Sequence, residues 1–240
     1  MNANGTITVA AGTTAGTYTY SYTICDIVNP TNCDTVSATV TVTAPVINAV
    51  NDAPAAANGF SGATTASVLA NDTLNGAAVN PANITLTPGA APTPAAGSIT
   101  MNANGTITVA AGTTAGTYSY PYTICENLNP TNCDTATATV VVNPPAIDAV
   151  ADALASVNGF TGATTASVLA NDTLNGAAVN PAAITLTPGT APSPASGSIT
   201  MNADGTITVA AGTTAGTYSY SYTICEIVNP ANCDTTFATV

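Results

Sequence analysis

The six cysteines are the residues whose spacing most clearly predicts a defined chemistry. They form three pairs with seven residues between the partners, and no cysteine is left over. Zinc is a poor alternative, because structural zinc sites use four cysteine or histidine ligands and this chain has no histidine. The pattern predicts disulfides, and with them an oxidising compartment. The predicted bonds are Cys25–Cys33, Cys125–Cys133 and Cys225–Cys233.

The carboxylates are the other groups that could do chemistry, and all but Asp204 fall into two clusters. One cluster flanks the cysteine pairs: Asp26, Asp34, Glu126, Asp134, Glu226 and Asp234. The other follows two proline-containing segments: Asp52, Asp72, Asp148, Asp152 and Asp172. Paired carboxylates can act as acid and base, but no histidine, lysine or aromatic-lined cleft accompanies them. We therefore interpret them as solvated turn residues and expect no enzyme and no catalytic residue.

Calcium is the functional alternative for the second cluster, because this hard cation prefers oxygen ligands. Residues 48 or 148, 52 or 152, and the Asn-Asp pairs at 71–72 and 171–172 could converge on one ion. However, calcium takes about six to eight oxygens. Few carboxylates are present, and Asn-Asp is also an ordinary turn sequence. We expect no cofactor, with calcium as the one candidate.

The charge balance excludes several classes of partner. The chain has 12 Asp plus Glu and no Lys, Arg or His, which gives a net charge of -12. Nucleic acids and anionic lipid surfaces are bound through cationic side chains, and none is present. No apolar run is long enough to span a bilayer. We therefore expect neither a nucleic-acid partner nor membrane insertion, and no salt bridge between side chains can form.

The elements that must position these residues recur every 100 residues. Residues 1–40 return with few changes at 101–140 and 201–240, which indicates a tandem array. Because proline ends strands, Thr43–Val46 and Asn143–Ala146 mark the boundaries. The predicted units are the C-terminal half of a repeat at 1–46, a complete repeat at 47–146 and a nearly complete repeat at 147–240.

Each repeat has the residue pattern of a β-sandwich. Apolar and polar residues alternate over Tyr118–Ile124 and Ala136–Val142, which predicts a hairpin with one buried face. The cysteines fall on its outer face, where neighbouring strands bring Cβ atoms into bonding range. Asn104-Gly105 predicts a second hairpin. The other predicted strands are 47–51, 64–70, 84–88, 98–102 and 106–110.

These strands define the expected fold class. About seven strands and no helix per repeat indicate an all-β immunoglobulin-like or cadherin-like sandwich. Stacked units of this kind form a rod. Both ends of the sequence fall inside a predicted repeat, so we expect a window of a longer chain. Strand addition between neighbouring subunits is the alternative.

Four segments resemble a known group of proteins. They are Val68–Gly76, Gly97–Thr108, Gly116–Cys125 and Thr137–Val142. They resemble the tandem cadherin-like repeats of giant bacterial surface adhesins, and the cysteine-containing form is similar to repeats of the gliding-motility adhesins of Bacteroidota. The resemblance covers essentially the whole chain. It implies an extracellular filament on the bacterial cell surface, exported by the type IX system. The complete lack of basic residues is a departure that the resemblance does not explain.

The same resemblance gives a meaning to four Asp-Thr-apolar triplets. Each is similar to the O-glycan acceptor pattern of Bacteroidota, although so short a pattern arises easily by chance. It recurs here because the repeat recurs. The candidate glycosylation sites are Thr35, Thr73, Thr135 and Thr173.

Two functions fit this organisation. The first is structural: the repeats form part of a long extracellular filament or cell-surface adhesin that serves surface attachment or gliding motility. Its partners would be neighbouring repeats or filament subunits, and the sequence does not identify a ligand at the tip. The alternative is that each repeat is itself a glycan- or cell-binding module. Near-identical repeats without elaborated loops or exposed aromatics favour the first.

Overall fold

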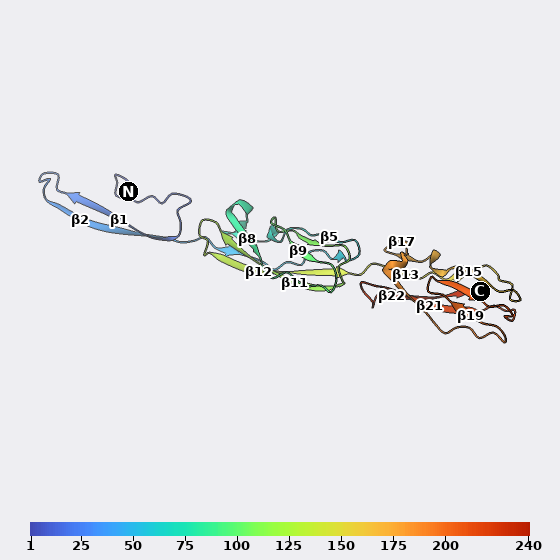
Figure 1. Ribbon diagram of the computed structural model, residues 1–240. Helices are drawn as coiled ribbons and strands as arrows, with labels where there is room; N and C mark the ends of the chain where they lie inside the picture. Colours follow the sequence, from blue (N-terminus) through green and yellow to red (C-terminus); the bar gives the residue numbers. More distant parts are fainter.

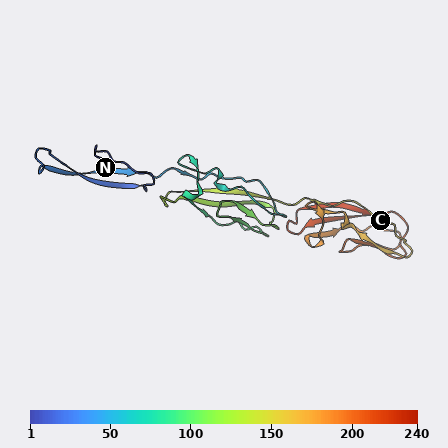
Figure 2. The same ribbon diagram turned by 90° about the horizontal axis from the view of Figure 1, so that it is seen from above.

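The protein is elongated. The computed structural model describes all residues from Met1 to Val240. Two views at right angles show three bodies in a row, in chain order (Figures 1 and 2). We call them the N-terminal segment (residues 1–46), the middle repeat (47–146) and the last repeat (147–240).

The middle repeat is a sandwich of a four-stranded and a three-stranded sheet, with strand orders β4-β12-β11-β8 and β5-β10-β9. A small third sheet, β3-β6-β7, lies beside them. The all-β sandwich is confirmed, with ten strands in place of the predicted seven. The strand bounds are β3 Ile47–Asn48, β4 Ala57–Asn58, β5 Ala63–Thr64, β6 Thr73–Leu74, β7 Ala77–Ala78, β8 Ile84–Pro88, β9 Ile99–Met101, β10 Ile107–Val109, β11 Gly116–Glu126 and β12 Cys133–Asn143.

The last repeat has the same three sheets, in the orders β14-β22-β21-β18, β15-β20-β19 and β13-β16-β17. The strand bounds are β13 Ile147–Asp148, β14 Asp152–Ala153, β15 Ala163–Ser167, β16 Thr173–Leu174, β17 Ala177–Ala178, β18 Ile184–Pro188, β19 Ile199–Met201, β20 Thr206–Val209, β21 Ser219–Glu226 and β22 Cys233–Thr239. The tandem arrangement of two sandwiches follows directly from the sequence repeat.

The long hairpin β11–β12 forms with the predicted alternation. Its register runs from Gly116 opposite Val142 to Cys125 opposite Cys133. Tyr122 on β11 is 1% exposed, and the inward side chains of β12 are buried as well. Burial of one large apolar side chain stabilises a fold by roughly 1.5–3 kcal/mol, so this hairpin supplies much of the core.

Each repeat has a core of its own. One buried cluster contains only residues from Ala57 to Val142, and the other only residues from Ala149 to Ala238. No buried residue belongs to both clusters. Each sandwich therefore closes around its own apolar side chains.

One predicted strand is wrong over part of its length. The expected strand 64–70 ends early in the middle repeat, and the chain turns into a short 3-10 helix, η1 (Val68–Ala70). The Ser67 side chain accepts a hydrogen bond from the Leu69 amide and caps this turn. A strand would place Val68 and Leu69 on opposite faces, whereas the turn buries both. The last repeat repeats the turn as η3 (Val168–Ala170), so the expectation of no helix is also wrong.

Other 3-10 turns and short strands also escaped prediction. The 3-10 helices η2 (Pro81–Asn83) and η4 (Pro181–Ala183) precede β8 and β18. The two-residue strands β4, β6 and β7 were not expected, because they are too short to show a period. By contrast, Ile84–Pro88 has the expected bounds.

The N-terminal segment contains one sheet, formed by β1 (Gly16–Cys25) and β2 (Cys33–Val42). The stretch Thr6–Ala10 has the same residues as Thr106–Ala110, which includes β10, but it forms no strand. The match to residues 101–140 predicts the second arm of a hairpin around Asn4-Gly5 here, as around Asn104-Gly105, and this prediction is wrong. The counterpart β10 pairs with β5 and β9, and no equivalents of these strands are present for residues 6–10. The presence of pairing partners, and not the local sequence, therefore determines whether this stretch forms a strand.

The repeat provides a matched test of burial. Ile124 is 0% exposed, whereas Ile24, at the same place in the repeat, is 65% exposed. We expect Ile124→Ala to lower the free energy of unfolding by about 2–5 kcal/mol, because it leaves a cavity in a closed core. Ile24→Ala should change it by less than about 0.5 kcal/mol. Urea denaturation followed by tyrosine fluorescence measures both, and equal losses would contradict the assignment of the core.

Candidate functional site

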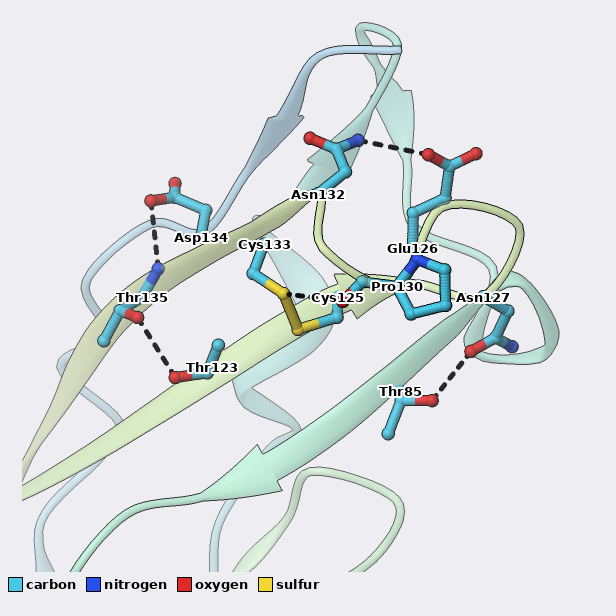
Figure 3. The surroundings of a disulfide bond; sticks show 10 residues. All are labelled: Thr85, Thr123, Cys125, Glu126, Asn127, Pro130, Asn132, Cys133, Asp134 and Thr135. Carbon is cyan, nitrogen blue, oxygen red and sulfur yellow. Dashed lines mark hydrogen bonds between the residues drawn. A yellow bond between two sulfur atoms is a disulfide. The ribbon is translucent and has the colours of Figure 1, made fainter. Parts of the chain in front are cut away.

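The disulfide end of each hairpin is the first candidate site. Cys125 and Cys133 are bonded, as are the equivalent pairs in the other two bodies, and no free cysteine remains. The bond closes the loop 126–132 on the outer face of the hairpin (Figure 3). The pairing agrees with the register of the two strands, which places the cysteines opposite each other.

A buried carboxylate organises this loop from inside. Glu126 is 5% exposed, and its Oε2 accepts hydrogen bonds from the side-chain amides of Asn129 (2.8 Å) and Asn132 (3.1 Å; the second is drawn in Figure 3). Glu226 is buried in the same way. The interpretation of these residues as solvated is therefore wrong. The loop folds back over the carboxylate and supplies it with neutral donors.

The carboxylate beyond the disulfide ties the hairpin to the incoming chain. Asp134 accepts hydrogen bonds from its neighbour Thr135 and, through its other oxygen, from the Ala49 amide, both at 2.9 Å. Asp234 and Ala149 repeat the second contact in the last repeat. Glu126, Asp134 and their counterparts in the last repeat thus have structural partners.

The second candidate site is a buried hydroxyl surrounded by acceptors. The Tyr122 hydroxyl lies 3.0 Å from Asp52 Oδ2 and 3.1 Å from Asp72 Oδ1. It also lies 3.0 Å from the Val50 carbonyl and 3.3 Å from the Val68 carbonyl. A hydroxyl has one proton to donate, so these oxygens outnumber the donor. The cluster joins the entry segment, the η1 turn and β11 at one point.

Burial is the main cause of the raised pKa values in this cluster. Asp72 is 0% exposed. Loss of solvation raises the pKa of Asp72 and Asp52, and hydrogen bonds from the Val50 amide and the Tyr122 hydroxyl offset part of this shift. Burial and the two carboxylates also raise the pKa of Tyr122, so the hydroxyl stays protonated.

The last repeat has the same cluster with one difference. The Tyr222 hydroxyl lies 3.0 Å from Asp152 and 3.1 Å from Asp172. Asp172 Oδ2 is buried and has no hydrogen-bond partner. Burial again raises the pKa of Asp172 and Asp152.

The calcium ligand set does not fit this geometry. The structure brings Asp52 to Asp72 and Asp152 to Asp172, but the tyrosine hydroxyl stands where their oxygens converge. Asp148 acts electrostatically on Asp172 without joining the contact. No group of three or more Asp, Glu, Cys or His side chains is placed to hold a metal ion. Even with the Val50 and Val68 carbonyls, five oxygens lie within 3.3 Å of the Tyr122 hydroxyl, fewer than the roughly six to eight that calcium takes.

The four candidate glycan acceptors lie in two different settings. Thr35 and Thr135 are exposed on the disulfide hairpins. Thr73 and Thr173 are half-buried in short strands, and each follows a fully buried aspartate. The Thr35 and Thr135 hydroxyls are exposed but share hydrogen bonds with Thr23 and Thr123 across the hairpin, and glycosylation there stays a prediction.

Comparison with known proteins gives no family. No family model and no curated protein matches the chain. Among solved structures, the protocadherin gamma-B4 extracellular domain is 11% identical with a TM-score of 0.31, covering 93% of this chain and 39% of that one. Drosophila N-cadherin EC1-4 is 14% identical (TM-score 0.33; 86% of this chain, 51% of that one).

A bacterial neighbour shows a similar degree of likeness. It is a SusE-like surface-located polysaccharide-binding protein of Bacteroides thetaiotaomicron, 13% identical with a TM-score of 0.28, covering 82% of this chain and 32% of that one. This chain therefore spans about half or less of these three proteins. Sequence identities and TM-scores this low do not establish a family. None of the helical turns has the length and apolar character needed to cross a bilayer.

The disulfides can be tested directly. Unreduced, denatured protein should take up no thiol-alkylating reagent, and reduced protein should take up six equivalents, one for each cysteine. Peptide mapping after cleavage by a protease other than trypsin should link each cysteine to its partner eight positions away. Labelling before reduction would contradict the three bonds.

The buried carboxylates predict a specific pH dependence. A carboxylate whose pKa is raised on folding contributes stability below its unfolded pKa and loses it as the pH rises through the folded value. Between about pH 7.5 and pH 5, above the isoelectric point near 4.1, wild-type protein should gain stability relative to Asp172→Asn as the pH falls.

Asp204 gives a matched control in the same repeat. Hydrogen bonds from Thr206 lower the pKa of this exposed carboxylate, so it stays ionised in both the folded and the unfolded state over this pH range. Asp204→Asn should therefore change stability by an amount that does not vary with pH. Urea midpoints across the pH range measure both variants. A difference between wild type and Asp172→Asn that does not change with pH would contradict the role of burial.

Proposed function

We propose that this chain is a structural segment of a long extracellular filament or cell-surface adhesin, in which successive sandwiches stack end to end as a rod. The observation that carries the proposal is the linear arrangement of bodies with separate cores (Figures 1 and 2). Each repeat buries its apolar residues internally and contacts only its neighbours. Further repeats can therefore be added to lengthen the molecule without changing those already present.

The chemistry of the chain supports an extracellular location. All six cysteines are in disulfides, which persist in oxidising compartments. The proposed place is a bacterial cell surface, with surface attachment or gliding motility as the process served. The support for this finer assignment is the resemblance of the repeat motifs. The proposed partners are neighbouring repeats and filament subunits.

Catalysis is not part of the proposal. Carboxylates of both clusters, among them Asp134, Asp72 and Glu126, accept hydrogen bonds from a backbone amide, a tyrosine hydroxyl and an asparagine respectively. Glycan binding by each repeat is the alternative function, and it has less support. Ligand sites are commonly lined by aromatic side chains. In the middle repeat, Tyr120 and Tyr122 face the core, and Tyr118 packs against it. The expectation of no exposed aromatics is nevertheless wrong, because Phe60, Phe160 and Phe237 are exposed.

The rod predicts a simple scattering experiment. Proteins that carry one, two or three additional copies of residues 47–146 between the middle and last repeats should lengthen by a constant increment per copy. Small-angle X-ray scattering measures the maximum dimension of each protein. A dimension that rises much more slowly than the number of copies would indicate a compact assembly and overturn the proposal. Binding of the unextended chain to a glycan array would favour the alternative.

A further inference from the structure

The contacts between neighbouring bodies use the same position at both joints. Asn129 Oδ1, in the middle repeat, accepts a hydrogen bond from the Ala15 amide of the N-terminal segment (2.6 Å). Asn229 Oδ1, in the last repeat, accepts one from the Ala115 amide of the middle repeat (2.5 Å). In both cases the acceptor lies in the loop closed by a disulfide. The repetition of the contact after 100 residues argues for a built joint.

The loop fixes the orientation of this asparagine. Asn229 Nδ2 donates to the buried Glu226 of its own loop at 2.8 Å, and Asn129 Nδ2 donates to Glu126 in the same way. The amide nitrogen is therefore occupied inside the loop, and the amide oxygen faces the preceding repeat. The disulfide closes the loop at its base and limits the freedom of the residues between the cysteines.

The same loop also holds the connecting segment. Asn232 Nδ2 donates to the Pro145 carbonyl at 2.9 Å, and Asn132 donates to the Pro45 carbonyl at the same distance. One loop thus binds both the body of the preceding repeat and the chain that leads out of it. This arrangement restrains the linker as well as the repeat.

A second contact lies elsewhere on the joint between the middle and last repeats. Asn58 Nδ2 donates to Asn175 Oδ1 at 3.0 Å, and Asn175 is held in the left-handed region at φ 55°. The nearby Phe60 is 39% exposed, whereas Phe160, which no repeat follows in this chain, is 87% exposed. Two separate contacts resist pivoting better than one.

Charge explains why neutral groups form the joint. The chain carries 12 acidic and no basic side chains, so no ion pair can join two repeats. No set of three carboxylates is placed to share a metal ion. Side-chain amides and backbone amides can bridge two acidic bodies without further charge. Glu226 is the only carboxylate between the cysteines of the last repeat. It is buried and accepts hydrogen bonds from two asparagines.

We propose that the loop closed by each disulfide is a docking element for the preceding repeat, and that it holds successive repeats in a fixed orientation without a metal ion. The proposal builds on the rod described above and assigns its joint. The partner is the edge of the preceding repeat at Thr114-Ala115. The disulfide serves this joint by keeping the loop in the shape that presents the asparagine oxygen.

Amide hydrogen exchange of the intact 240-residue chain tests the proposal without any substitution. Ala115 and Ala15 should exchange at least about tenfold more slowly than Ala215, the same position in the last repeat, which no docking loop covers in this chain. Exchange of Ala115 as fast as that of Ala215 would overturn the proposal.

Two matched substitutions locate the effect. Asn229→Ala should bring Ala115 to the exchange rate of Ala215, with Ala15 unchanged. Asn29→Ala removes the same residue from the loop of the N-terminal segment, where no repeat precedes it in this chain, and should leave all three amides unchanged. Exchange of the core amide of Ile224 reports whether the last repeat stays folded. Protection of Ala115 that survives Asn229→Ala would overturn the docking role.

Solution conditions test the two remaining parts. Reduction of the disulfides should release Ala115, and a chelator of divalent cations should not. Release by the chelator would overturn the metal-free joint, and protection unchanged by complete reduction would overturn the role of the disulfide.

Scattering of the same samples separates the two proposals. An elongated wild type with an unprotected Ala115 rejects the joint alone, whereas a compact wild type rejects the rod.

Discussion

No salt bridge between side chains is possible in this protein, and the rest of the structure depends on that constraint. With 12 carboxylates and no basic side chain, every buried negative charge must be stabilised by neutral donors. Asn129 and Asn132 donate hydrogen bonds to Glu126, and the Val50 amide and the Tyr122 hydroxyl donate to Asp72. A buried charge without such partners is costly.

The carboxylate clusters therefore connect elements of the fold. The Tyr122 hydroxyl lies among oxygens from the entry segment, the η1 turn and the aspartates beside them, and it links these segments to the long hairpin. Asp134 links the hairpin to the entry segment again from the outer face. Both contacts hold the start of a repeat against its end, which are far apart in sequence. This closure allows each sandwich to complete its core without its neighbours.

The joints extend the same chemistry to the contact between repeats. The disulfide loop has a buried glutamate inside and an asparagine oxygen outside, so a single amide side chain serves two bodies. Repeats of like charge repel one another, and screening by salt weakens this repulsion. Neutral hydrogen bonds are less sensitive to salt than ion pairs. We therefore expect the proposed rod to depend less on salt concentration than a rod joined by ion pairs.

The sequence by itself determined the features that depend on neighbouring residues. The alternation over Tyr118–Ile124, the Asn104-Gly105 turn, the strand Ile84–Pro88 and the pairing of the cysteines all follow from short-range patterns. Gly105, for example, adopts φ +80°, which the turn requires and glycine permits. The hundred-residue period similarly fixed the tandem order of the sandwiches. These features need no information about distant segments.

Only the tertiary structure decided the rest, because each remaining feature needs a partner far along the chain. Thr6–Ala10 and Thr106–Ala110 have the same residues, yet only the second contains a strand. Ile24 and Ile124 differ in burial for the same reason. The burial of Asp72 and the contact of Asn229 with Ala115 join residues separated by tens to more than a hundred positions. Local sequence can supply the donor and the acceptor, but the packing of whole strands and repeats brings them together.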